Sequence, residues 1–187
     1  AYGRDAWYQQ FYDKFIQDPS NVKFKENLHL GLSDQFLAAA SNEDLAATAQ
    51  AVVEDLINNV MSRAANFNWS TNLVYGGGVA LNCLANRHLG SNFSKIWIMP
   101  NPGDAGNSLG AAALAYGHRL NWTGANLGHD IPGDYPVNDI LDQLVSGNIV
   151  GVASGRAEFG PRALGNRSLL ADPRGTTIKD RVNAIKR

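Results

Sequence analysis

Two stretches of the chain place hydrophobic residues at the three- and four-residue steps of a helix. The longer one starts after Ser41, which stands three residues before Asp44 as in a capping box, and continues to about residue 65. Aromatic residues between positions 5 and 16 recur at similar intervals and predict a packing face. The apolar stripe of the long helix consists of Leu45, Ala49, Val52, Val53, Leu56, Ile57, Val60 and Met61.

Short apolar runs bounded by turn residues predict strands at residues 72–75, 95–99, 148–153 and 168–171. Helical spacing returns over residues 79–89, 107–116 and 139–145. This alternation is typical of an α/β domain with a mainly parallel sheet. Residues 156–166, rich in Gly, Pro and Arg, are expected to form an irregular loop.

Residues 117–137 are rich in Gly, Pro, Asn and Asp, which is typical of a linker. We therefore predict one domain over residues 1–118, a linker over 119–138 and a second domain over 139–187. The last part holds only two strands and about two helices, too few to bury a core of its own. We expect the chain to be a piece of a larger protein.

The composition is that of an ordinary globular protein, with 187 residues, 44% hydrophobic and 18% charged. No apolar run approaches the roughly 20 residues that cross a bilayer, and the first residues lack a signal-peptide pattern. The single cysteine, Cys83, cannot form an internal disulfide. We expect a soluble, cytoplasmic protein with no membrane partner.

The net charge of −1 hides an asymmetry along the chain. Residues 1–155 hold 8 Lys/Arg and 14 Asp/Glu, a net −6, whereas residues 156–187 hold 8 against 3, a net +5. Arginine binds phosphate or carboxylate through two parallel hydrogen bonds. The excess of positive charge in residues 156–187 therefore indicates either an anionic ligand or a basic surface. The arginines lie among Gly and Pro without interleaved aromatics, which disfavours a nucleic-acid partner.

Three motifs carry candidate chemistry. The first, Gly76, Gly77 and Gly78 followed by Asn82, joins a strand to a helix, where backbone can approach a phosphorylated ligand; a turn that merely needs glycine is the alternative. The second places Asp104 between glycines before a helix, where it could hold Mg²⁺ bridging phosphate oxygens or could cap the helix.

The third motif contains Arg156, Arg162 and Arg167, at steps that cannot share one helical stripe. A loop folded around a small anion would bring these arginines together, and Glu158 could pair with one of them. The alternative is a loop held by salt bridges alone. The density of glycine favours the anion site.

These motifs, in this order, resemble the O-carbamoyltransferase family, which includes nodulation-factor and antibiotic carbamoyltransferases. The matching blocks are residues 74–86 (VYGGGVALNCLAN), 100–113 (PNPGDAGNSLGAAA) and 155–174 (GRAEFGPRALGNRSLLADPR). The third block is the most diagnostic. The first two are also similar to the tRNA threonylcarbamoyl-adenosine synthase family, which shares the actin/Hsp70/sugar-kinase fold.

The resemblance implies an α/β fold in two parts. Residues up to about 118 would form the second half of an actin/Hsp70/sugar-kinase-like ATPase domain, and the residues after the linker would begin a YrdC-like α/β domain. Enzymes of this family use ATP and carbamoyl phosphate to make a carbamoyl-adenylate. They then pass the carbamoyl group to a hydroxyl of a sugar or natural product.

The resemblance also assigns roles. The nucleotide would contact Gly76, Gly77, Gly78 and Asn82, a divalent metal (Fe²⁺ or Mg²⁺) would bind Asp104, and the phosphate or carbamoyl group would face Arg156, Arg162 and Arg167. In the family, histidines of an N-terminal half share the metal, and no H-x-x-x-H spacing is present among His29, His88, His118 and His129. A homodimer is a further expectation.

We expect the natural protein to transfer carbamoyl groups and these 187 residues alone to be inactive. Two alternatives remain. One is a tRNA threonylcarbamoyl transferase, which would not be expected to carry the third block on the same chain. The other is a non-catalytic nucleotide-binding module similar to a chaperone ATPase lobe, which has no need of the arginines.

Overall fold

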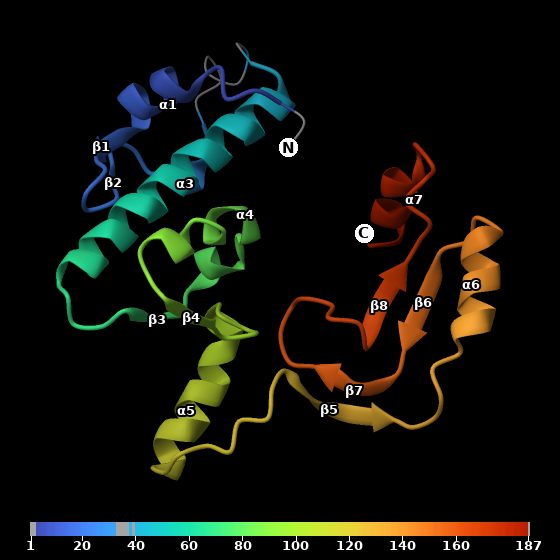
Figure 1. The fold of residues 1–187 in the computed structure, drawn as a ribbon. Helices are drawn as coiled ribbons and strands as arrows, with labels where there is room; N and C mark the ends of the chain where they lie inside the picture. Colours follow the sequence, from blue (N-terminus) through green and yellow to red (C-terminus); the bar gives the residue numbers. More distant parts are fainter. Residues whose placement is uncertain (1–2, 33–37, 39, 187) are drawn as a thin grey trace. The chain divides into compact units, whose positions relative to one another are not determined.

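The computed structural model describes residues 3–32, 38 and 40–186 and divides the chain into two compact units (Figure 1). The first unit is Ala1–Ile98 and the second is Met99–Arg187. Both units mix helices with small sheets, each of two strands. The chain is therefore of the mixed α/β class, as the sequence predicts.

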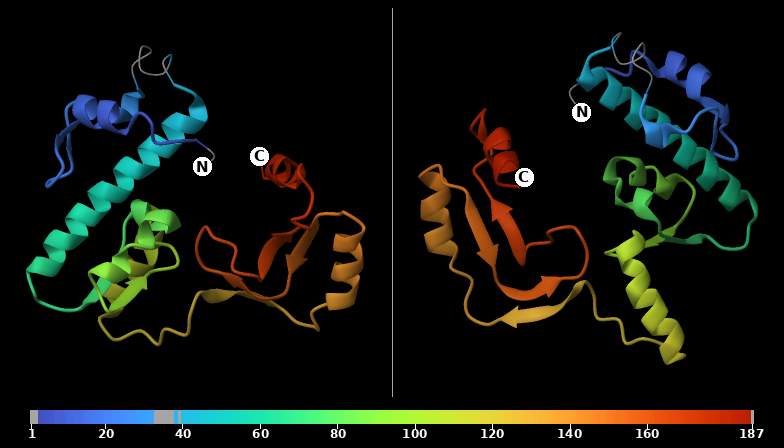
Figure 2. Two further views of the ribbon diagram at one scale, coloured as in Figure 1. Left: turned by 45° about the horizontal axis from the view of Figure 1, so that its top comes forward. Right: turned by 180° about the vertical axis from the view of Figure 1, so that it is seen from behind.

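In the first unit, helix α1 lies along the long helix α3 (Figures 1 and 2). Strands β1 and β2 pair antiparallel, and β3 and β4 pair parallel with Asn72 opposite Lys95 and Tyr75 opposite Ile98. The elements of this unit are α1 (Tyr8–Phe15), β1 (Ile16–Asp18), β2 (Lys23–Phe24), α3 (Asn42–Asn66), β3 (Asn72–Tyr75), α4 (Cys83–Asn86) and β4 (Lys95–Ile98).

Helix α3 begins where its sequence predicts. The Ser41 hydroxyl accepts a hydrogen bond from the Asp44 amide at 3.1 Å, which satisfies one of the free N–H groups of the first turn. The apolar stripe of α3 packs on the aromatic face of α1, and both predictions are confirmed. The core between them consists of Phe11, Phe15, Ile16, Val52 and Leu56.

Residues 79–89 do not form the single helix that their spacing predicts. They form a 3-10 turn over Gly78–Leu81, the four-residue helix α4, and a second 3-10 turn over Leu89–Ser91. The break falls at Asn82, whose backbone (φ −80°, ψ 88°) leaves the helical region. Its side chain accepts a hydrogen bond from the Ala85 amide at 3.2 Å, so Asn82 starts α4 rather than continuing a helix.

The second unit contains two antiparallel strand pairs, β5 with β7 and β6 with β8 (Figure 1). Its helices at residues 107–116 and 137–145 and its strands at 150–153 and 167–170 agree with the prediction to within two residues. The elements are α5 (Asn107–Tyr116), β5 (Asn126–Ile131), α6 (Val137–Val145), β6 (Val150–Ala153), β7 (Gly155–Glu158), β8 (Arg167–Leu170) and α7 (Ile178–Ile185).

Two expectations about this architecture are wrong. Among the described strands only β3 and β4 pair in parallel, so the sheets are not mainly parallel. Residues 156–158, the start of the irregular loop expected over 156–166, lie in β7, which pairs with β5 inside the predicted linker segment. Gly128 makes this pairing close, since a Cβ there would stand 2.6 Å from the Ala157 Cβ. The domain boundaries at 118 and 139 stay a prediction.

None of the helices in the described ranges is both long enough and apolar enough to cross a membrane. The longest, α3, has polar and charged residues on the side opposite its core-facing stripe.

Candidate functional site

The glycine turn follows β3 directly. Gly77 has φ +99°, a conformation that favours glycine, and Gly76 and Gly78 flank it. A Cβ on any of the three would meet no atom within 4 Å in the described structure. The backbone of this turn is therefore open to a ligand, which the nucleotide-contact prediction requires.

Asn82 is held by a reciprocal amide pair with Gln50 of α3. Gln50 Nε2 donates to Asn82 Oδ1 at 3.1 Å, and Asn82 Nδ2 donates to Gln50 Oε1 at 3.0 Å. With the Ala85 amide also bound to Oδ1, only one Nδ2 proton remains for a ligand. The pair fixes the segment after the glycine turn on α3.

Glu54 extends this network on α3. Its side chain is 16% exposed and accepts hydrogen bonds from Gln50 Nε2 at 2.8 Å and Arg87 Nη2 at 3.2 Å, with His88 Nε2 also at 3.2 Å. The Gln50 hydrogen bond is the largest cause that lowers the pKa of Glu54. Sequence reasoning missed Gln50 and Glu54, because nothing distinguishes them from other polar residues on the solvent side of a helix.

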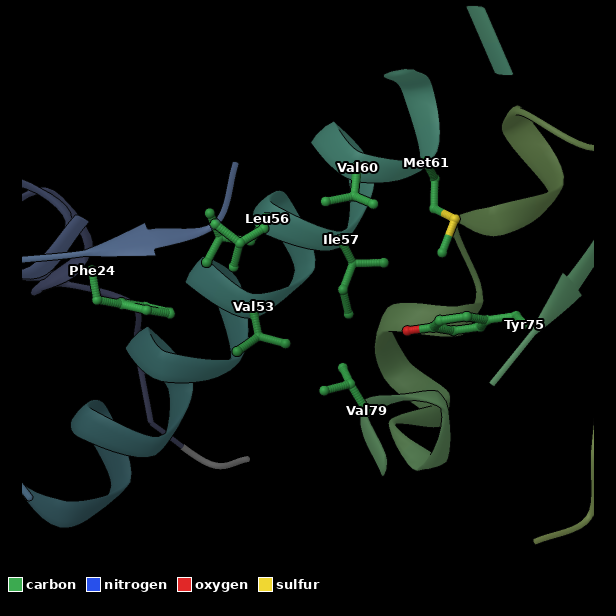
Figure 3. A pocket seen from close by; sticks show the side chains of 9 residues that line it. Phe24, Val53, Leu56, Ile57, Val60, Met61, Tyr75 and Val79 are labelled. Atoms are coloured by element: carbon green, nitrogen blue, oxygen red, sulfur yellow. The ribbon is translucent and has the colours of Figure 1, made fainter. Parts of the chain in front are cut away.

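An apolar cavity of about 340 Å³ lies beside the glycine turn in the first unit (Figure 3). Tyr75 and Val79, which bracket the three glycines, form one wall, and Tyr75 directs its hydroxyl toward α3. Burial raises the pKa of Tyr75. The remaining lining residues are Val22, Phe24, Val53, Leu56, Ile57, Val60 and Met61.

Asp104 begins the 3-10 turn Asp104–Gly106 that precedes α5. Its side chain is exposed, and within the described residues its carboxylate takes part in no hydrogen bond or ion pair. The helix-cap alternative is therefore not what the structure shows. The carboxylate is available to a ligand.

Asp104 fits a metal site in which the protein supplies few ligands and the substrate and water supply the rest. The described part of the chain has no group of three or more His, Cys, Asp or Glu side chains that could hold a metal ion. A site closed by protein ligands is therefore not formed by these residues. Mg²⁺ is commonly held through one or two carboxylates together with substrate phosphates and water, and Asp104 suits that arrangement.

Arg167, the first residue of β8, uses its guanidinium to bind backbone carbonyls. Nη1 donates to the oxygens of Asn166 at 2.7 Å and Ser154 at 3.0 Å. Nη2 donates to the His129 oxygen at 3.1 Å, and both nitrogens lie 3.3 Å from the Gly155 oxygen. The side chain thereby ties β8 to β5 and to the corner between β6 and β7.

Glu158, at the end of β7, complements Arg167 by binding backbone amides. Its Oε1 accepts from Asn166 N at 2.7 Å, Leu164 N at 2.8 Å and Arg167 N at 3.2 Å. Partial burial would raise the pKa of Glu158, but these amide hydrogen bonds outweigh it and lower the pKa to about 2. Glu158 therefore binds the backbone of the loop through three amides.

Arg156 and Arg162 differ from Arg167 in exposure. Both are exposed, Arg156 on β7 opposite Asp130 of β5 and Arg162 within residues 159–166, which we call the arginine loop. The structure thus closes this loop by contacts at its two ends and presents Arg162 between them. The guanidinium of Arg167, in contrast, is half-buried and occupied by backbone carbonyl oxygens.

A cavity of about 570 Å³ in the second unit adjoins the arginine loop. Ala163, next to Arg162, lines it together with Arg167 and with Lys186, which follows α7. The charge of Lys186, together with that of Arg167, whose guanidinium donates to backbone carbonyls, favours an anion in the cavity. Sequence reasoning missed Lys186, because its position near the end of the chain gives no motif. The other lining residues are Gly151, Val152, Ser168, Leu169, Leu170 and Val182.

Comparison with known proteins assigns the chain to a family. It matches the carbamoyltransferase N-terminus model over residues 5–113 and the carbamoyltransferase C-terminus model over residues 141–187. The chain therefore belongs to the carbamoyltransferase family, which confirms the resemblance found in its motifs.

Three relatives illustrate the match. The chain is 35% identical over 172 residues to nodulation protein NolNO of Sinorhizobium fredii, covering 77% of the chain and 25% of the relative. It is 35% identical over 170 residues to nodulation protein U of Azorhizobium caulinodans, covering 80% and 30%. It is 33% identical over 136 residues to the 3'-hydroxymethylcephem-O-carbamoyltransferase of Streptomyces clavuligerus, covering 62% and 26%. The chain thus spans between 25% and 30% of the length of these relatives.

Proposed function

We propose that the protein containing these residues is an ATP-dependent O-carbamoyltransferase. Carbamoyl phosphate, ATP and water would give carbamoyl-adenylate, pyrophosphate and phosphate. A hydroxyl oxygen of the acceptor would then attack the carbamoyl carbon, with AMP leaving and the hydroxyl proton released. The Streptomyces clavuligerus relative, named for a hydroxymethyl compound, supports a hydroxyl-bearing small molecule as acceptor.

The observation that carries this proposal is the anion-suited cavity beside the arginine loop, within the region matched by the carbamoyltransferase C-terminus model. Arg156 and Arg162 would contact the phosphate or carbamoyl oxygens, where charge builds during transfer. Arg167 would contribute by holding the loop, because its guanidinium already binds four carbonyl oxygens.

The remaining roles concern the nucleotide. The open backbone of Gly76, Gly77 and Gly78 would contact its phosphates, and the free Nδ2 proton of Asn82 would donate to it. Asp104 would hold a divalent metal, which neutralises phosphate charge when bound. A supply of ATP and carbamoyl phosphate favours the cytoplasm as the place of action.

Calorimetric titration of the full-length protein tests these assignments. Carbamoyl phosphate is titrated first, and then ATP with Mg²⁺ or Fe²⁺, into wild type, Arg162→Ala and Asp104→Ala. Arg119→Ala, an exposed arginine of the second unit outside the motif, serves as the control. A charge-assisted contact is worth about 1.5–3 kcal/mol, so Arg162→Ala should weaken carbamoyl phosphate about 10- to 100-fold.

The other variants should separate the two ligands. Asp104→Ala should leave carbamoyl phosphate binding unchanged and should remove the metal dependence of ATP binding. Arg119→Ala should behave as wild type. A wild type that binds nucleotide but not carbamoyl phosphate would contradict the proposal and would support the nucleotide-binding module instead.

A further inference from the structure

The arginine loop touches the loop that carries Asp104, and the contact is made by backbone. Gly160, in the arginine loop, has φ +119°. A Cβ at this position would overlap the carbonyl oxygen of Pro100 and would stand 3.3 Å from the Asn101 amide nitrogen. Both loops belong to the second unit. Only a glycine allows this approach.

Asn101, whose amide lies at the Gly160 contact, is packed through its carbonyl on a second glycine. A Cβ on Gly106 would overlap the Asn101 carbonyl oxygen and would stand 2.7 Å from the Met99 Cε. Gly106 closes the turn that begins with Asp104, since its amide donates to the Gly103 oxygen at 3.0 Å. One short backbone segment therefore lies between Gly160 and the Asp104 turn.

The arginine loop itself is held at both ends. Glu158 binds the amides of Leu164, Asn166 and Arg167, and Phe159 N donates to the Ala125 oxygen at 2.6 Å. Because both ends are held, we expect the loop to shift as a rigid unit. Such a shift would displace Pro100 through its contact with Gly160, and would then displace the Asp104 turn through the contact of Asn101 with Gly106.

We propose that Gly160 is a positioning residue that seats the arginine loop on the Asp104 loop and thereby couples binding of the two ligands. The identity of the ligands rests on the proposed function, with metal–nucleotide at Asp104 and carbamoyl phosphate at the arginines. Each ligand restricts the motion of the loop that it binds. Through the contact between Gly160 and Pro100, the motion of the other loop is restricted as well. Binding of one therefore strengthens binding of the other.

The chain offers a matched control at Gly165, in the same loop. Its φ of +116° is nearly that of Gly160, so an alanine suffers similar backbone strain at either position. A Cβ on Gly165, however, would meet no atom within 4 Å in the described structure. The difference between Gly160→Ala and Gly165→Ala therefore reports the contact with Pro100, and the strain cancels.

Hydrogen exchange in the full-length protein tests the contact without reference to ligands. The amides of Asn101 and of residues 103–106 should exchange faster in Gly160→Ala than in wild type, and Gly165→Ala should match wild type there. Equal exchange of these amides in the two variants would overturn the inference. This readout does not depend on the proposed function.

Ligand titration tests the coupling. Carbamoyl phosphate is titrated with and without Mg²⁺ and a non-hydrolysable ATP analogue. Wild type and Gly165→Ala should bind it at least about fivefold more tightly when the analogue is present, and Gly160→Ala should show no such gain. Ligands that bind wild type independently would overturn the inference and leave the proposed function standing. A wild type that never binds carbamoyl phosphate would refute the proposed function, and the exchange comparison would still decide the role of Gly160.

Discussion

Replacing Arg167 with alanine removes the guanidinium that ties β8 to β5 and to the corner between β6 and β7. The bonds lost lead to the carbonyl oxygens of Ser154, Gly155, Asn166 and His129, at 2.7 to 3.3 Å. Each net hydrogen bond of this kind contributes about 1 kcal/mol, and those to Gly155 are shared between two nitrogens. Because the side chain is only half-buried, water can rehydrate part of what is lost. We expect a total loss of about 2–4 kcal/mol.

The assay is native-state hydrogen exchange of the β7 and β8 amides in the full-length protein, which reports the free energy of opening this part of the structure. Arg119→Ala, exposed and outside the motif, is the control and should stay within about 0.5 kcal/mol of wild type. Arg167→Lys keeps the charge but not the planar fork of donors, so it should recover less than half of the loss. An Arg167→Ala protein that opens like wild type while losing carbamoyl phosphate affinity would refute the structural role and make Arg167 a direct ligand contact.

Two further predictions concern the hydrogen bonding of Thr48 and Glu158. Thr48 is fully buried in α3 and its hydroxyl has no hydrogen-bond partner within the described residues, so Thr48→Val should raise the free energy of unfolding by about 1 kcal/mol in denaturant titration; an unchanged or lower value would show that the hydroxyl is satisfied. Glu158 has its pKa lowered to about 2 in the folded protein, so its stabilising effect is complete above pH about 4.5 and is lost as the pH falls toward 2. The free energy of opening β7 and β8, taken from exchange after correction for the intrinsic rate at each pH, should fall over this range in wild type but not, from this cause, in Glu158→Gln. Parallel pH profiles of the two proteins would contradict the assignment.

The parts of the fold that were predictable from the sequence are those set by local signals. The Ser41 cap and the apolar stripe behind it locate α3, and the run of small residues after Asn107 locates α5 to the residue. Strand β3 is predicted by four residues, Asn72–Tyr75, that are followed directly by glycines. In each case the residues that decide the structure are neighbours in the sequence.

The parts that were missed depend on distant partners. Strand β5 lies in a stretch rich in Gly, Asn and Asp, and only its pairing with β7 makes it a strand. The sequence alone does not distinguish an arginine that binds a ligand from one that binds backbone carbonyl oxygens. The structural role of Arg167 could therefore not be predicted. The same holds for Glu158, whose partners are backbone amides, and for Gly160, whose partner is the Pro100 carbonyl.

The motif residues differ in their structural setting: Arg156 lies in β7 and Arg167 begins β8, whereas the glycine turn and Asp104 lie outside the strands. Gly77 adopts positive φ in a turn where an added Cβ would meet no atom of the described residues within 4 Å, and the Asp104 carboxylate has no partner among those residues. The Asn82 side chain, in contrast, forms most of its hydrogen bonds with Gln50 and with the Ala85 amide. Whether a polar residue serves a ligand or the fold was decided by tertiary contacts that spacing does not encode.

The most direct test of the proposed chemistry is exchange of labelled pyrophosphate into ATP by the full-length protein. Carbamoyl-adenylate formation from ATP releases pyrophosphate, and its reversal returns the label to ATP. The account predicts label in ATP only when carbamoyl phosphate and a divalent metal are present, loss of exchange in Arg162→Ala, and normal exchange in Arg119→Ala. Exchange that is the same without carbamoyl phosphate, or none in its presence, would contradict it.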